Sequence, residues 1–460
     1  HRDLHSFPTR RSSDLTQAIQ DLNNTVPLVA GKRVFVRGYA RLAANSTAQA
    51  GFDVPVLLRV LHAPATGLGQ APFTEVPGSP FPAVHSPMVG PVEALAAVRT
   101  NGAATYLFEV PESLVTPGRL QFEFILNPGR TVPETASNPL ANNTATATLD
   151  VHQTIRPGLM MVTVKHGSGF YDPASADSAF WDILARARTL LPIPGFRLGF
   201  RTVPVVNSTR SPSGFEGPGF EFPADRDRAL DAVDAVRIID GNPLGGPYVG
   251  MVPPAATNFG GIGRRPGQAM VVRMSGEWRG DSAWGAFVGG GTLAHEFGHN
   301  TGLKHVRSDL ACGSEIPEGP WDSLPNGASP CTLGAINLGD PATAVGFDPL
   351  SRAVIPPDRA GDLMSYATNR WISEFNWRRM LDVYTARAAS RGTVAEPALH
   401  DLEPGSRLIV LGWVDPATHS GDLLPAYTLP APWAAVVVPQ VGFVGRSLAA
   451  LEYLRGAAGG

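Results

Sequence analysis

The chain has 460 residues, which predicts about three domains at roughly 150 residues each. Its formal net charge of −3 gives no reason to expect nucleic acid or an anionic membrane as a partner. The sequence holds no apolar run of about 20 residues, so we expect no transmembrane segment. The 50 glycines and 43 prolines favour turns and short strands over long helices.

The first segment, HRDLHSFPTRRSSDL (residues 1–15), differs from a targeting sequence. It has no initiator methionine and no apolar core of the kind that a signal peptide needs. It resembles a translated sequencing adapter. We therefore expect residues 1–15 to be non-native and to lie outside the fold.

Residues 16–152 carry the pattern of a β-sandwich. Apolar and polar residues alternate in Arg33–Arg37 and in Gln121–Phe124, and turn residues separate such runs. Strands at this spacing, with no helical periodicity between them, predict an all-β accessory domain. The expected strands are Arg33–Tyr39, Val54–Leu61, Ala104–Val110, Leu120–Leu126 and Ala145–Asp150. The segments LVAGKRVFVRGYARL and NPGRTVPETASNPLANNTATATL resemble bacterial adhesion-type, immunoglobulin-like sandwiches.

Residues 153–393 change in character and predict an α/β domain. A nearly continuous apolar run at Leu159–Val164 is typical of a buried strand, and helical spacing follows it. The expected helices are Ala174–Leu191, Asp225–Ile239 and Ile372–Ala389, and the further strands are Phe196–Val205, Tyr248–Val252 and Ala269–Met274. Residues 394–460 return to short strands and predict a third β-domain that is cut short. Its expected strands are Arg407–Trp413, Tyr427–Leu429 and Ala434–Val438.

Three histidines and a glutamate share the segment GGGTLAHEFGHNTGLKH (residues 289–305). On a helix, His295 and His299 are four residues apart and lie on one face, so both imidazoles can reach one ion, with Glu296 beside them. Gly302 can adopt the left-handed conformation that ends a helix, after which the chain brings His305 back. Three neutral imidazoles leave a fourth zinc position for water, which is typical of a catalytic site. A helix with surface histidines and a zinc site without catalysis are the alternatives, and Glu296 argues against the second.

The segment HEFGHNTGLKH resembles the extended metzincin motif, HExxHxxGxxH. That family carries a methionine in a tight turn after the third ligand, and Asp362-Leu363-Met364-Ser365-Tyr366 matches it. The resemblance implies that Met364 packs beneath the imidazoles and that Tyr366 contacts the metal or the oxyanion. A packed core tyrosine remains the alternative for Tyr366. The residue after the third ligand, Val306, matches no subfamily cleanly, so none is assigned.

The resemblance implies a secreted bacterial zinc endopeptidase with one catalytic Zn²⁺, in which Glu296 is the general base that activates water. In the family the substrate, a protein or peptide, binds in extended form along an edge strand. Tyr248–Val252 and Phe259–Gly263 both remain candidates for that strand. We expect a monomer, and the sandwich is a candidate for binding a surface or a glycan. The rival functions are an adhesin with a vestigial protease lobe and a zinc amidase that acts on cell-wall or glycoprotein material.

The two cysteines, Cys312 and Cys331, lie 19 residues apart without a CxxC pattern. This spacing favours a disulfide that closes a long loop, and it argues against the two cysteines as ligands of a metal ion. The acidic loop from Gly339 to Asp348 is a candidate for calcium, but it lacks an EF-hand pattern. No calcium ligand is assigned.

Overall fold

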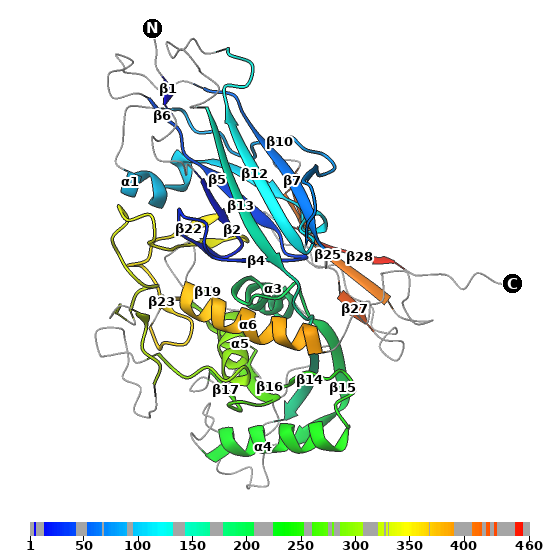
Figure 1. Cartoon of the computed structure of the whole chain (residues 1–460). Helices are drawn as coiled ribbons and strands as arrows, with labels where there is room; N and C mark the ends of the chain where they lie inside the picture. The colour runs from blue at the N-terminus through cyan, green and yellow to red at the C-terminus, as the bar shows by residue number, and fades with distance from the viewer. Residues whose placement is uncertain are drawn as a thin grey trace, which may run out of the picture.

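The computed structural model describes residues 4–5, 13–42, 53–66, 69–89, 95–131, 143–165, 178–206, 224–252, 260–274, 278–279, 286–306, 321–325, 328–329, 331–367, 369–390, 407–415, 420–423, 427–429 and 447–453. These residues form several β-sheets and a few helices (Figure 1). No helix among them is long and apolar enough to cross a membrane.

The first part of the chain folds into two β-sheets that share one apolar core. The larger sheet has the order β10 (Phe81–Pro82), β7 (Val56–Thr66), β12 (Gly118–Leu126), β13 (Thr144–His152) and β4 (Leu28–Val29), and β8 (Gly69–Gln70) and β9 (Thr74–Glu75) also pair with β7. The smaller sheet has the order β11 (Tyr106–Val110), β5 (Val34–Gly38) and β2 (Ser13–Thr16). Every second residue of β12 from Leu120 to Leu126 is buried, as the alternation in the sequence predicts. Phe108 and Phe124 meet edge to face between the sheets, with ring centroids 5.9 Å apart.

Smaller elements surround these sheets. They are β1 (Leu4–His5), which pairs with β6 (Arg41–Leu42), the helix α1 (Leu95–Thr100) and the 3-10 turns η1 (Gly102–Ala104) and η2 (Glu112–Leu114).

The sandwich begins earlier than the sequence predicts. Strand β2 starts at Ser13 and pairs antiparallel with β5, so that Leu15 lies opposite Val36 and is fully buried. The expectation that residues 1–15 lie outside the fold is therefore wrong for Ser13–Leu15, and also for Leu4 and His5, which pair with β6. The physical reason is local, because Leu15 covers apolar surface at the edge of β5.

The central part of the chain contains a five-stranded sheet. Its order is β15 (Arg197–Val206), β14 (Gly158–Lys165), β16 (Tyr248–Val252), β18 (Ala269–Arg273) and β17 (Gly261–Gly263). The first four strands are parallel, and β17 pairs antiparallel with β18 at the edge. The helices are α3 (Ser178–Leu190), α4 (Ala224–Ile239), α5 (Val288–Asn300) and α6 (Glu374–Ser390).

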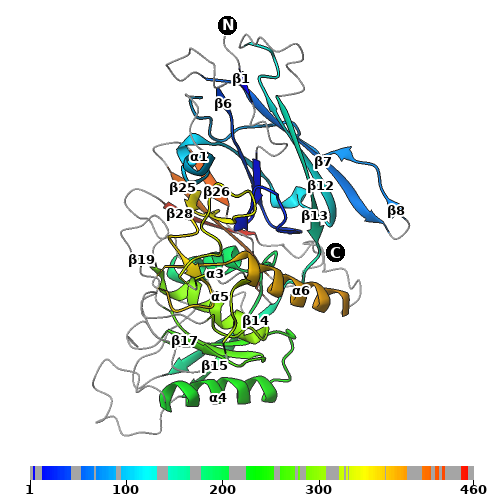
Figure 2. The same ribbon diagram turned by 60° about the vertical axis from the view of Figure 1, so that its left-hand side comes forward.

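Both faces of this sheet are buried, which explains the continuous apolar run in β14. Leu159 and Met161 join the core cluster that includes residues of α3 and α5, whereas Val162 and Val164 pack with residues of α4. Figures 1 and 2 show α4 on one side of the sheet and α3, α5 and α6 on the other, between the sheet and the sandwich. The helix that carries His295 and His299 thus lies between a sheet and a second layer of helices.

The segment between β2 and β4 enters the core of the central part. Strand β3 (Ile19–Gln20) pairs antiparallel with β21 (Val345–Asp348), which also pairs with β22 (Ala353–Ile355). The carbonyl oxygen of Ala18 accepts hydrogen bonds from Phe347 N at 2.7 Å and from Trp371 Nε1 at 2.8 Å. Residues between 16 and 27 therefore stabilise the central part directly, although composition assigned them to the sandwich alone.

The remaining short strands lie along the loops and in the last segment. They are β19 (Trp278–Arg279), β20 (Ala286–Phe287), β23 (Gly361–Asp362) and β24 (Arg370–Trp371) in the central part. In the last segment, β25 (Arg407–Asp415) pairs with β26 (Ser420–Leu423), β27 (Tyr427–Leu429) and β28 (Ser447–Tyr453). The expected strand Ala434–Val438 lies outside the described residues.

Candidate metal centre

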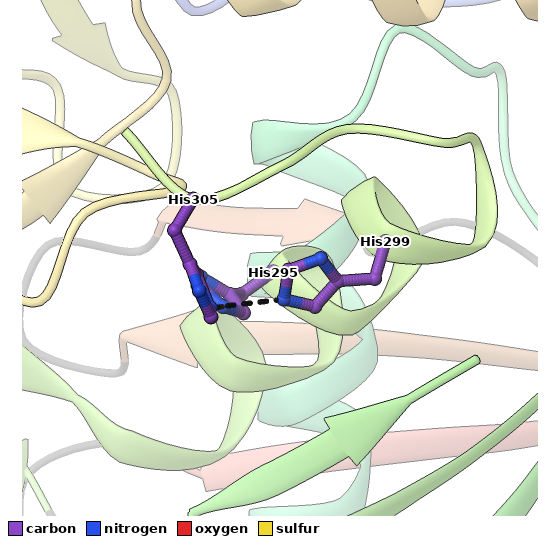
Figure 3. Close-up of side chains that lie close together, drawn as sticks. All are labelled: His295, His299 and His305. Atoms are coloured by element: carbon purple, nitrogen blue, oxygen red, sulfur yellow. Dashed lines mark hydrogen bonds between the residues drawn. The ribbon is translucent and has the colours of Figure 1, made fainter. Parts of the chain in front are cut away.

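Helix α5 presents His295 and His299 on one face, four residues apart. Figure 3 shows both rings turned toward His305, which comes from the chain beyond the end of the helix. His295 and His299 are buried, at 3% and 7% exposed, and His305 is half-buried. Among the described residues, these three form the only group of histidine, cysteine and carboxylate side chains with the spacing to hold a metal ion.

The turn after α5 delivers His305 to the other two rings. Gly302 has φ +96°, a left-handed conformation that a side chain would strain. The amide of Leu303 donates to Gly298 O at 3.0 Å and that of Gly302 to His299 O at 2.9 Å, the pair of bonds that ends helices at glycine. Beyond the turn, Val306 N donates to Met364 O at 3.0 Å, which fixes the position of His305.

The three Nε2 atoms converge on one point. That of His305 lies 3.2 Å from that of His295 and 3.1 Å from that of His299. Tetrahedral zinc with Zn–N bonds of about 2.0–2.1 Å requires N···N separations of about 3.3 Å. The opposite ring nitrogens are engaged, because Nδ1 of His295 donates to Leu363 O at 2.8 Å and Nδ1 of His299 to Leu303 O at 3.0 Å. These bonds place the proton on Nδ1 and leave the Nε2 lone pair for a metal ion.

Burial keeps the three imidazoles neutral. Desolvation lowers the pKa of His295 well below its ordinary value, and it lowers the pKa of His299 as well. Desolvation, with a contribution from His299, lowers the pKa of His305 to about 3. The neutral form is the one that binds metal ions, so the protein holds this cluster in the form that a cation needs.

Glu296 lies beside the histidines and beneath the edge strand β17. A Cβ atom on Gly261 would lie 2.8 Å from Glu296 Oε1, so glycine is what lets the strand approach the carboxylate this closely. The side chain is 4% exposed, and its Oε2 has no hydrogen-bond partner among the described residues. Burial raises the pKa of Glu296 to about 8, although the charges of Arg370 and Arg226 act in the opposite direction. A buried carboxylate oxygen without a hydrogen-bond partner among the described residues fits a neighbouring cation or a proton in transfer.

The Met364 segment forms a tight turn under the histidines. Met364 is fully buried, and its sulfur lies against Gly298 of α5. Asp362 holds this turn, because its carboxylate accepts bonds from Met364 N at 2.6 Å and from Asn376 Nδ2 at 2.8 Å and a short one from Ser373 Oγ. Asp362 thereby ties the turn to the beginning of α6.

Tyr366 is the exposed residue of this turn, at 40%. Its ring centroid lies 4.8 Å from that of His305 and 6.1 Å from that of His295. The structure therefore brings Tyr366 to the rim of the histidine cluster. A core tyrosine, the alternative left open by the sequence, does not describe a side chain with this exposure.

Comparisons with known proteins leave the chain without a family. No family model matches it. No curated protein matches it either. A solved structure that matches is the CARDB domain of a Pyrococcus furiosus protein in complex with di-metal ions, with 16% identity over 33% of this chain and 88% of that one and a TM-score of 0.17. A likeness this weak carries no information about the metal centre.

The sequence analysis also expected a disulfide and a candidate calcium loop. Cys331 is in a disulfide, and the chain has one other cysteine, Cys312, which lies outside the described residues. In the acidic loop, the carboxylate of Asp348 is fully buried and pairs with Arg186 at 2.8 Å. That ion pair joins β21 to α3 and leaves Asp348 unsuited to a calcium site.

The sequence did not identify two residues of the site, Asp362 and Arg370. The signal for Asp362 was its place two residues before Met364, where a carboxylate can accept the amide bonds of a turn. Arg370 had no local signal. Its charge acts on Glu296, His295 and His305 across the fold, which no spacing in the sequence reveals.

Proposed function

We propose that this chain is a secreted zinc endopeptidase of the metzincin type. The observation that carries the proposal is the convergence of three Nε2 atoms beside the buried carboxylate of Glu296, where that of His305 lies 3.2 Å from that of His295 and 3.1 Å from that of His299. An all-nitrogen set of three ligands with an open fourth position suits catalytic zinc. The disulfide at Cys331 supports export, because disulfides persist in oxidising compartments.

The residues of the site have separable roles in peptide hydrolysis. His295, His299 and His305 would hold the ion, whose Lewis acidity makes water acidic and polarises a carbonyl group. Glu296 takes a proton from the attacking water and returns it to the leaving amine. Tyr366, at the rim, is placed to donate a hydrogen bond to the developing oxyanion.

The substrate would bind along β17. The two candidate strands differ in place, because β16 is flanked by β14 and β18, whereas among the described residues β17 pairs with β18 alone. An edge strand offers free amides and carbonyls to an extended peptide, and an interior strand does not. The contact between Gly261 and Glu296 would bring such a peptide directly over the general base.

The test is zinc content and casein cleavage, measured side by side for the wild type and Glu296→Ala. We expect one zinc ion per chain in both proteins and a loss of turnover of about 10²–10⁴-fold in the variant, because only the proton carrier is removed. Retained turnover would show that Glu296 is not the base.

His305→Ala serves as the second variant, because it leaves two ligands and should weaken zinc binding severely. A wild type that binds a surface but leaves casein uncut would favour the adhesin. Cleavage of only glycosylated or cell-wall material would favour the amidase.

A further inference from the structure

A guanidinium group with few partners borders the metal centre. Arg370 lies on β24, where it pairs with Gly361 just before the turn that carries Met364. Its side chain donates to Ser365 O, at the long distance of 3.5 Å. No described carboxylate lies within ion-pair distance of it. Four of its five N–H donors are thus left without a protein acceptor among the described residues.

The charge of Arg370 acts on the groups of the site. Burial lowers the pKa of Arg370, and the nearby Glu296 and Tyr366 raise it. The same charge lowers the pKa values of His295 and His305. A buried cation without a close counter-ion is unfavourable unless a ligand supplies one. The protein therefore keeps a cation beside the groups of the candidate metal centre.

Arg265 gives a comparison within the same site. It follows the edge strand β17, it is exposed, and its charge acts on His299 and His305. Water screens an exposed guanidinium, whereas a half-buried one keeps much of its attraction for an anion. Of the two arginines, Arg370 is the one that can distinguish a charged group from a neutral one.

We propose that Arg370 binds a carboxylate of the substrate beside the scissile bond, so that the site selects acidic peptides. The inference rests on the proposed peptidase function. The planar fork of arginine matches a carboxylate with two parallel hydrogen bonds, which a neutral amide cannot reproduce. The carboxylate is either an aspartate or glutamate side chain or the free C-terminus of the peptide.

The experiment uses the full chain loaded with zinc and peptides matched in length. One set carries Asp, Asn or Lys next to the cleaved bond in a peptide blocked at both ends. A second pair ends one residue after the bond, as free acid or as amide. If Arg370 binds a side chain, we expect kcat/KM to be about 10–100-fold higher for the Asp peptide than for the Asn peptide. If it binds the C-terminus, we expect the same difference between the free acid and the amide.

Arg370→Gln should reduce the ratio of kcat/KM between the charged and the neutral peptide to about 2-fold or less. Arg370→Glu should reverse the selectivity, so that the Lys peptide has the higher kcat/KM. Arg265→Gln, the matched control, should keep at least half of the wild-type ratio. Zinc content and thermal unfolding of each variant separate a loss of selectivity from a loss of fold.

Cleavage of Asp, Asn and Lys peptides at equal rates, with acid and amide also equal, would overturn this inference and leave the peptidase standing. Equal selectivity in wild type and Arg370→Gln would overturn it too. A wild type that cleaves neither casein nor any peptide would overturn the proposed function, and this inference with it.

Discussion

Gly298 and Met364 meet where helix α5, which carries His295 and His299, passes over the tight turn. A Cβ atom at position 298 would overlap the sulfur of Met364, whereas one at Gly291, on the same helix, would meet nothing within 4 Å. The same substitution at these two positions therefore isolates the contact between helix and turn.

We expect Gly298→Ala to lower stability by about 1–3 kcal/mol through overpacking and to weaken zinc binding, because Met364 must move and carries the carbonyl that fixes Val306. Gly291→Ala should leave zinc binding unchanged and raise helix stability by up to about 1 kcal/mol. Thermal unfolding and zinc titration of both variants check this. Equal effects of the two variants would contradict the packing role of Met364.

At this scale the sequence predicted the residues whose chemistry is local. The spacing of His295, His299 and His305 and the glycine that ends the helix are sufficient to place three imidazoles together, and the structure shows a cluster that could hold a metal ion. Asp362 and Arg370 could not be predicted in the same way. Their roles depend on which distant segments pack against the turn.

Helix α3 connects the sandwich to helix α5. It packs against α5, and its last carbonyls accept three bonds from one side chain, the ammonium group of Lys32. The Nζ–O distances are 2.8 Å to Arg188, 3.0 Å to Thr189 and 2.6 Å to Leu191. A cation at a helix C-terminus is favourable, and this one also lies 4.6 Å from the centre of the Trp377 ring.

We expect Lys32→Met to lower the free energy of unfolding by about 2 kcal/mol, because it leaves buried carbonyls without donors. Burial lowers the pKa of Lys32 well below its ordinary value. Above that lowered pKa and up to about 10.5, the unfolded chain binds a proton that the folded chain lacks, so this group makes stability rise with pH.

The difference in unfolding free energy between wild type and Lys32→Met should therefore change with pH by up to about 1.4 kcal/mol per unit in this range. Urea denaturation of both proteins between pH 7 and 10 measures it. A constant difference across that range would contradict a lowered pKa for Lys32.

The periodicity of apolar residues in the sequence predicted the longer helices and strands, but it did not predict the short strands. Strand β16 has the bounds that the sequence predicts, and α4 differs from its prediction by one residue. Apolar period and length identify such elements because each is buried along its whole face. Strands of two or three residues, such as β3 and β23, form because distant segments pair with them. They are too short to show a periodic pattern of apolar residues in the sequence.

At the scale of the whole molecule, the sandwich and the central part interlock. Arg99 is fully buried and donates to the carbonyls of Leu338, Asp340 and Thr343, and Trp377 Nε1 donates to Pro27 O at 3.3 Å. Together with β3, these contacts make the sandwich part of the structure that supports the metal centre. The sequence could not show this, because composition locates linkers but not contacts between domains.

We expect the fragment of residues 153–460 to lack a cooperative thermal transition and to bind zinc weakly, because it loses β3 and the donors at the end of α3. Adding the fragment of residues 1–152 should restore both properties. Near-ultraviolet circular dichroism and zinc titration, with the full chain as control, measure this. Cooperative unfolding and tight zinc binding by residues 153–460 alone would show that the two parts are independent.

The pairing of β3 with β21 also determines when this part of the protein can fold during translation. Gln20 pairs with Val345, and the chain between them takes about 16–65 s to translate at about 5–20 residues per second. Throughout that interval Ile19 has no strand to pair with, and the turn at Met364 has not yet been made. The histidine cluster therefore acquires its supporting turn only after Met364 is made, 59 residues after His305.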